Sequence, residues 1–151
     1  MKQFPMIART LLLIPLLTLG LSSRSSAGDH LEISPADYKK SETMMRHWLS
    51  LADKGKYAET FAAAAELFRK NSSVEQWTTE RRKVLEERGK VLSRGKIDGF
   101  TPSEPPNSTS LPSYYMVTFK TRFEKKAGVE VIQLVRENGE WKIGHYQAAD
   151  K

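Results

Sequence analysis

The spacing of apolar residues changes once along this chain, and this change constrains the fold more than any other feature. Up to about Leu92 the apolar residues recur at helical spacing, whereas beyond Gly95 they alternate as in half-buried strands. A chain that places its helices before its strands is typical of α+β domains, in which helices pack on an antiparallel sheet. We therefore expect three N-terminal helices followed by a meander of three to four strands.

Three helices are predicted between residues 34 and 92. The first begins at Ser34-Pro35, an N-cap followed by proline at the first helical position, and ends at Gly55. The second runs from Tyr57 to the break at 71–73, and the third follows a capping box that starts at Ser73. Residues expected on their buried faces are Tyr38, Met45, Trp48, Leu49 and Ala52, then Tyr57, Phe61, Ala64, Ala65 and Phe68, then Val74, Trp77, Val84, Leu85 and Val91.

The strands are predicted from alternation and turn signals. A short strand at 96–100 precedes a loop at 101–112 that is rich in proline, serine and threonine. Alternation then predicts strands over 115–123, 129–136 and 141–147, the last two joined by the hairpin turn Asn138-Gly139. Tyr114 and Met116 make the second face of this sheet partly apolar, although open antiparallel sheets usually leave one face polar. One interpretation is a homodimer that forms through the sheet.

The first 27 residues resemble an export signal. Lys2 and Arg9 give a positive start before an apolar run, Leu11–Leu21, and Ser25-Ser26-Ala27 offers small residues for cleavage. We expect cleavage after Ala27, a flexible terminus at 28–33, a single domain at 34–151, and a periplasmic or secreted protein. The alternative is a retained anchor, but the run is shorter than the roughly 20 apolar residues that span a bilayer.

Charge and composition exclude several classes of function. Loss of the signal removes three basic and no acidic residues, so the net charge falls from +6 to +3. Acidic residues are interspersed with the basic ones, whereas nucleic-acid binding favours a concentrated basic face. The chain has no cysteine, so disulfides and thiol chemistry are excluded. The three histidines, His30, His47 and His145, match no metal-binding spacing, and no metal or cofactor is expected.

Two arginines fall within the apolar stripe of the third helix. A guanidinium at Arg81 or Arg88 must be paired, snorkel to the surface, or reach a cavity. One hypothesis is snorkelling or a structural ion pair with an acid such as Glu66. The other is contact with an anionic ligand.

The sequence carries no recognisable catalytic motif, since a nucleophile elbow, a phosphate-binding glycine loop and an HExxH pattern are all absent. A small pocket enzyme could still use a carboxylate base with a hydroxyl donor, and Asp98 or Glu130 with Tyr115 are the candidates. The structural alternative places Asp98 in a turn and pairs Glu130 with Lys120 or Arg122 across the sheet.

A set of residues in a fixed order and spacing carries a family resemblance. These residues are Trp48-Leu49, Asp53, Gly55 and Tyr57, then Trp77, Gly89 and Arg94, then Leu111-Pro112, Tyr115, Phe119, Phe123 and Glu130, and finally the segment 137–146. Together they resemble the bacterial domain of unknown function 4019 family, over roughly residues 44–147. The resemblance implies a cystatin-like, nuclear transport factor 2-like fold, with a curved sheet around helices and often a cone-shaped pocket. It implies no activity.

Three hypotheses for function follow. The first is a non-enzymatic binding or accessory module of the cell envelope, which holds a small ligand or docks on an envelope protein. The second is a small pocket enzyme with a carboxylate base, and the third is a structural or self-associating protein. The candidate ligand-binding residues are Arg81, Arg88, Arg94, Tyr115 and Glu130.

Overall fold

The computed structural model describes residues 33–103 and 114–151, all within one unit of the chain. The expected export signal, its cleavage site and residues 104–112 of the expected loop lie outside the described residues. The helices are α1 (Pro35–Asp53), α2 (Tyr57–Ala63), α3 (Glu66–Asn71) and α4 (Val74–Arg88). The strands are β1 (Val91–Ser103), β2 (Tyr114–Phe123), β3 (Ala127–Glu137) and β4 (Glu140–Ala149).

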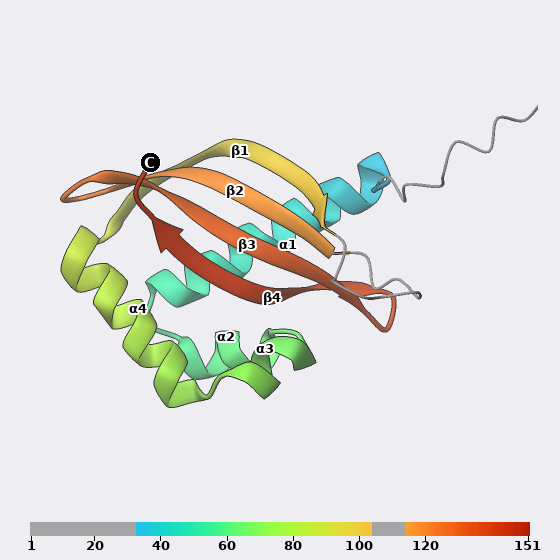
Figure 1. Cartoon of the computed structure of the whole chain (residues 1–151), viewed down its shortest axis with the longest axis horizontal. Helices are drawn as coiled ribbons and strands as arrows, with labels where there is room; N and C mark the ends of the chain where they lie inside the picture. The colour runs from blue at the N-terminus through green and yellow to red at the C-terminus, as the bar shows by residue number, and fades with distance from the viewer. Residues whose placement is uncertain (1–32, 104–113) are drawn as a thin grey trace, which may run out of the picture. The chain divides into compact units, whose positions relative to one another are not determined.

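The strands form one antiparallel sheet in the order β1-β2-β3-β4, so β1 and β4 are its edges (Figure 1). The predicted hairpin between β3 and β4 is confirmed. Asn138 and Gly139 both have positive φ, at 52° and 80°, and two such residues give the turn twist that matches the flanking strands. The α+β class and the meander are therefore as the sequence predicts.

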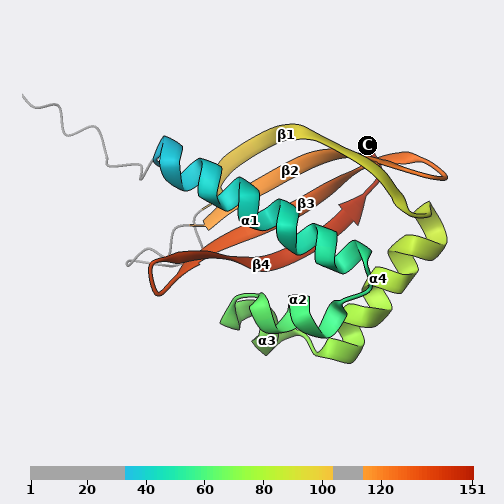
Figure 2. The same cartoon turned by 180° about the vertical axis from the view of Figure 1, so that it is seen from behind.

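Helix α1 lies across one face of the sheet (Figure 2). The Ser34 hydroxyl accepts a hydrogen bond from the Asp37 N–H at 3.0 Å, which confirms the predicted N-cap. The ring of Tyr38 packs on Phe100 of β1 with centroids 5.0 Å apart, and farther along α1 Trp48 packs on Tyr146 of β4 at 6.2 Å. Two ends of one helix thus contact the two edge strands.

The prediction of three helices is wrong in one place, because the expected second helix is two short helices. Ala64 and Ala65 are extended, and the Ala65 N–H donates to the Ile143 carbonyl of β4 at 2.8 Å. The Glu137 carboxylate then accepts the Glu66 N–H at 2.8 Å, where α3 begins. An alanine run has high helix propensity, but propensity is weak beside such tertiary hydrogen bonds.

The boundary between α4 and β1 also differs from the prediction. The helix ends at Arg88 rather than near Leu92, because Gly89 adopts a φ of +78° and Lys90 donates its N–H to the Glu124 carboxylate. Strand β1 is longer than the predicted 96–100, since pairing with β2 extends it from Val91 to Ser103. The residues at 101–103, expected in a loop, belong to this strand.

The core contains a group of aromatic rings beside Thr60. The Trp48 indole N–H donates to the Thr60 carbonyl at 2.8 Å and the Trp77 indole N–H donates to the Thr60 hydroxyl at 2.9 Å. Phe68 and Tyr146 meet Trp77 edge to face. Other buried apolar residues are Met45, Leu49, Ala52, Ala64, Tyr115, Val117, Phe119, Ile132, Leu134, Trp141 and Ile143. On the second face of the sheet Tyr114, Met116 and Val131 are half-buried, and a homodimer through that face stays a prediction.

Candidate functional site

A buried carboxylate, Glu130 of β3, is the centre of a network of charged side chains. Glu130 is 0 % exposed. Arg94 of β1 donates two hydrogen bonds to its carboxylate, with Nε–Oε2 at 2.5 Å and Nη2–Oε1 at 3.0 Å. The hydroxyls of Thr121 and Tyr146 each donate to the same carboxylate at 2.8 Å. The carboxylate oxygens therefore receive four hydrogen bonds, as a buried anion requires.

The network extends to the end of α1 through Asp53. Arg94 donates to this carboxylate with Nη1–Oδ2 at 2.6 Å and Nη2–Oδ1 at 2.9 Å. Arg81 of α4, itself 0 % exposed, donates to Asp53 Oδ1 at 3.1 Å and to the Tyr146 hydroxyl. The Arg81 guanidinium also lies over the ring of Tyr146, 4.9 Å from its centroid. Two cations and two anions balance, and together with the hydroxyls of Thr121 and Tyr146 they join α1 and α4 to all four strands.

The pKa shifts in this network favour a charged carboxylate and guanidinium and a protonated phenol. Burial alone would raise the pKa of Glu130, but the hydrogen bonds and charge of Arg94 outweigh it and hold that pKa below its usual value. Burial likewise disfavours the charged form of Arg94, yet Asp53 and Glu130 raise the pKa of the guanidinium. Burial and the neighbouring Glu130 raise the pKa of Tyr146, which stays a protonated donor.

The low pKa of Glu130 predicts a loss of stability in acid. A carboxyl whose pKa is lower in the folded protein stabilises it above its unfolded pKa, near 4.5, and this contribution is lost as the pH falls towards the folded pKa. We expect the urea concentration at the midpoint of unfolding to decrease once the pH falls below about 4.5. Glu130→Gln should flatten this acid limb; an unchanged limb in the variant would contradict the assignment to Glu130.

Three of the five predicted site residues come together here, namely Arg81, Arg94 and Glu130. A structural ion pair, one of the expectations for Arg81, is present, but the partner is Asp53 and not Glu66. Glu66, at the start of α3, pairs with Lys70 on its own helix at 2.7 Å.

The predicted partners of Glu130 were also wrong, and the alternation of β2 gives the reason. Glu130 and Thr121 point into the core, whereas Lys120 and Arg122 are exposed. Lys120 instead pairs at the surface with Asp98 at 2.6 Å. An alternating strand presents neighbouring residues to opposite faces, so neither of these cations reaches the buried carboxylate.

The other two predicted residues lie apart from the network. Arg88 is buried at the end of α4, over the ring of Phe123 and 2.7 Å from the Asp150 carboxylate. Tyr115 packs between Phe100 and Trp141, with ring centroids 4.6 and 5.4 Å away. The five predicted residues therefore do not line one common ligand site.

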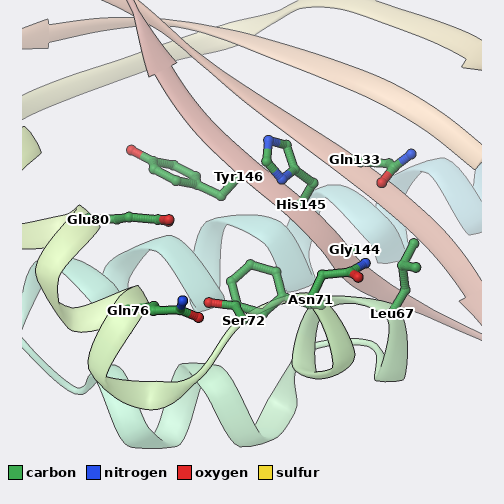
Figure 3. Close-up of a pocket in the computed structure, with 10 residues that line it drawn as sticks. Leu67, Asn71, Ser72, Gln76, Glu80, Gln133, Gly144, His145 and Tyr146 are labelled. Carbon is green, nitrogen blue, oxygen red and sulfur yellow. The ribbon is translucent and has the colours of Figure 1, made fainter.

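A groove between α4 and β4 is the feature that the sequence did not reveal. Its first half is a hollow of about 250 Å³ where α3 meets α4 (Figure 3). Glu80 and Gln76 extend into the view from α4, opposite Gly144, His145 and Tyr146 of β4. The remaining lining residues are Leu67, Phe68, Asn71, Ser72 and Gln133.

The second half of the groove is a hollow of about 380 Å³ beside the end of α4. It shares Glu80, His145 and Tyr146 with the first hollow, so the two adjoin each other. Residues that line only this half are Lys83, Val84, Glu87, Arg88, Gln147 and Ala148. We call the two hollows together the β4 groove.

The charges along the β4 groove are partly paired. Lys83 lies 3.8 Å from Glu87, and Arg88 pairs with Asp150, whereas Glu80 makes no ion pair with any described residue. Glu80 lines both halves of the groove. The groove therefore presents one unbalanced negative charge at its middle.

Helical spacing could have shown part of this site, since the groove residues of α4 share one face of the helix. The sequence offered no sign of the other wall, because the order of strands decides whether β4 is an edge. His145 is an exposed residue that lines the groove.

No group of three or more acidic or histidine residues in the described ranges is arranged to hold a metal ion. Within those ranges, no helix is both long and apolar enough to cross a bilayer.

Comparison with known proteins identifies a family but no activity. A search among curated proteins found no match. The sequence pattern of one family, described as a protein of unknown function (DUF4019), matches residues 44–146, which is more than half of the chain. This chain therefore belongs to the DUF4019 family.

Proposed function

We propose that this protein is a non-enzymatic binding module that works outside the cytoplasm, as its N-terminal segment predicts, and holds a polypeptide partner in the β4 groove. The observation that carries the proposal is that the groove is lined along its whole length from two sides, by α4 and by β4. Binding sites of this kind are concave and combine apolar walls with a few placed polar groups.

The buried network supports a binding role over a catalytic one. A general base at neutral pH needs a raised pKa and access to substrate, whereas the pKa of Glu130 is lowered and its oxygens are occupied by Arg94, Thr121 and Tyr146. Glu130 and Asp98 line neither half of the β4 groove. Within the network, Arg81 of α4 donates to the Tyr146 hydroxyl of β4 and so links the two walls of the groove.

Two exposed glutamates on α4 make a matched test of the proposal. Glu80 lines the groove, whereas Glu86 lines neither of its halves. Peptides that bind the chain would be selected from a phage-displayed random dodecamer library, and their affinities would be measured by calorimetry. Glu80→Lys should weaken binding by about tenfold or more, because reversing one charge in an interface places like charges together. Glu86→Lys makes the same change of net charge and should leave affinity unchanged.

Two results would contradict the proposal. One is a selection that yields no peptide with measurable affinity. The other is a set of peptides that Glu80→Lys and Glu86→Lys affect equally, since such peptides would bind outside the groove or respond only to net charge.

A further inference from the structure

We infer that the partner segment in the β4 groove is an extended peptide that joins the sheet as a fifth strand along β4, with a lysine or arginine opposite Glu80. This inference rests on the proposed binding function and adds the conformation and the charge of the occupant. Strand addition to an exposed sheet edge is a recurring mode of peptide recognition, in which main-chain hydrogen bonds provide affinity.

The groove lies at the edge of β4 rather than over one face of the strand. Successive side chains of a strand point to opposite faces of the sheet. Tyr146 is buried towards the core and His145 is exposed on the other face, yet both line both hollows. Gln147 and Ala148 repeat this alternation in the second hollow. A cavity that contacts both faces of a strand must run along its edge, in line with the sheet.

The main chain of this edge is available for pairing. The one main-chain hydrogen bond that β4 receives from the described residues outside the sheet is the bond from the Ala65 N–H to the Ile143 carbonyl, at 2.8 Å. The groove begins at the next residue, Gly144. Between His145 and Ala149 the pairing of β4 with β3 continues without a register shift, which leaves the outer groups of the strand regularly spaced.

The chain itself shows how a segment can use this edge. Ala64 and Ala65 are extended, with ψ of 165° and 156°, and they meet β4 at Ile143 before α3 turns away. An added peptide would continue along the edge where this pair leaves it.

The opposite edge of the sheet is less suited to strand addition. Strand β1 has three register shifts against β2 and carries charged residues such as Lys96 and Asp98. Irregular, charged edges are a common protection against pairing.

Length and charge fit a short extended segment. The β4 wall, Gly144–Ala148, spans about 13 Å in steps of about 3.3 Å per residue, and the α4 wall, Gln76–Arg88, spans about 18 Å in steps of about 1.5 Å per residue. The groove therefore holds about five residues in extended form. Glu80, which lines both halves and has no ion-pair partner among the described residues, favours a cationic side chain near the middle of the segment.

Backbone methylation separates strand addition from other binding modes. Peptides selected on the full chain would be synthesised with N-methyl groups on alternate residues, in two frames. In an added strand, only every second N–H faces β4, so one frame should weaken binding by about tenfold or more and the other frame should have little effect. Amide exchange in β4 between 144 and 149 should slow on addition of the unmodified peptide. A peptide with glutamate in place of its central cation should bind Glu80→Lys better than it binds the wild type.

Each negative result has a distinct meaning. If the peptides depend on Glu80 but tolerate both methylation frames, the groove binds them and strand addition is wrong. If no peptide depends on Glu80, the proposed function fails together with this inference. A non-peptide compound that copurifies with the chain, seen in native mass spectrometry as mass lost on denaturation, and that slows exchange in β4 would also overturn the inference.

Discussion

Replacing Glu130 with glutamine should lower the free energy of unfolding by about 3–5 kcal/mol. Removal of one partner of a buried ion pair leaves an uncompensated charge, and that cost exceeds the net value of the pair itself. Here the loss would leave Arg94 and Arg81, both largely buried, sharing the single carboxylate of Asp53. Urea denaturation at pH 7, monitored by tryptophan fluorescence, measures the effect.

Asp98→Asn is the matched control for this variant. It makes the same change from carboxylate to amide in another strand of the sheet, but the ion pair of Asp98 with Lys120 is exposed, with side chains 43 % and 54 % accessible. Exposed pairs contribute about 0.2–1 kcal/mol. The double variant Glu130→Gln with Arg94→Gln should lose less stability than the sum of its single variants, because the second change removes the unpaired charge. A loss below about 1 kcal/mol for Glu130→Gln would show that the network is not needed for folding.

Replacing Trp77 with alanine should cost about 3–5 kcal/mol. Trp77 is 0 % exposed, and its ring meets Trp48, Phe68 and Tyr146 with centroids 5.1 to 5.5 Å away. Truncation of a buried aromatic side chain removes its transfer free energy and leaves a cavity that the neighbouring residues fill only in part. The same denaturation experiment measures the loss.

Two further variants separate the contributions to this effect. Trp77→Phe keeps most of the ring contacts but loses the hydrogen bond to the Thr60 hydroxyl, so it should cost about 1–3 kcal/mol. Leu92→Ala removes a side chain that is 55 % exposed, and it should change stability by less than about 0.5 kcal/mol. Equal effects of Trp77→Ala and Leu92→Ala would contradict the central place of Trp77 in the core.

The local elements were largely predictable because their signals lie in short stretches of sequence. Ser34-Pro35 marks the start of α1, and Asn138-Gly139 marks the turn between β3 and β4, in each case through the backbone geometry that those residues favour. Predictions failed where distant contacts act on the backbone. The hydrogen bond from Ala65 to Ile143 divides the expected second helix, and pairing with β2 extends β1 into the residues expected in a loop.

The sequence showed only one sign of the buried network, a charged residue on an apolar helix face. Arg81 lies within an apolar stripe, which implies that it has a buried partner but does not identify that partner. Asp53 lies 28 residues before Arg81, and Glu130 lies 36 residues after Arg94, separations at which spacing carries no information on contact. Only the folded chain shows that the four charges balance.

The sequence by itself determined the order of helices and strands, the hairpin turn and many of the apolar side chains of the core, because each depends on local periodicity and on the backbone preferences of single residues. The expected buried face of the third helix was largely wrong, since Trp77 is buried but Val74, Val84, Leu85 and Val91 are only half-buried. The tertiary structure alone decided which carboxylates meet Arg81 and Arg94, that β4 is an edge strand, and that α4 stands beside it with a groove between them. These features depend on the pairing of strands and the packing of helices far apart in the chain, and the free energy of such contacts leaves no local pattern in the sequence.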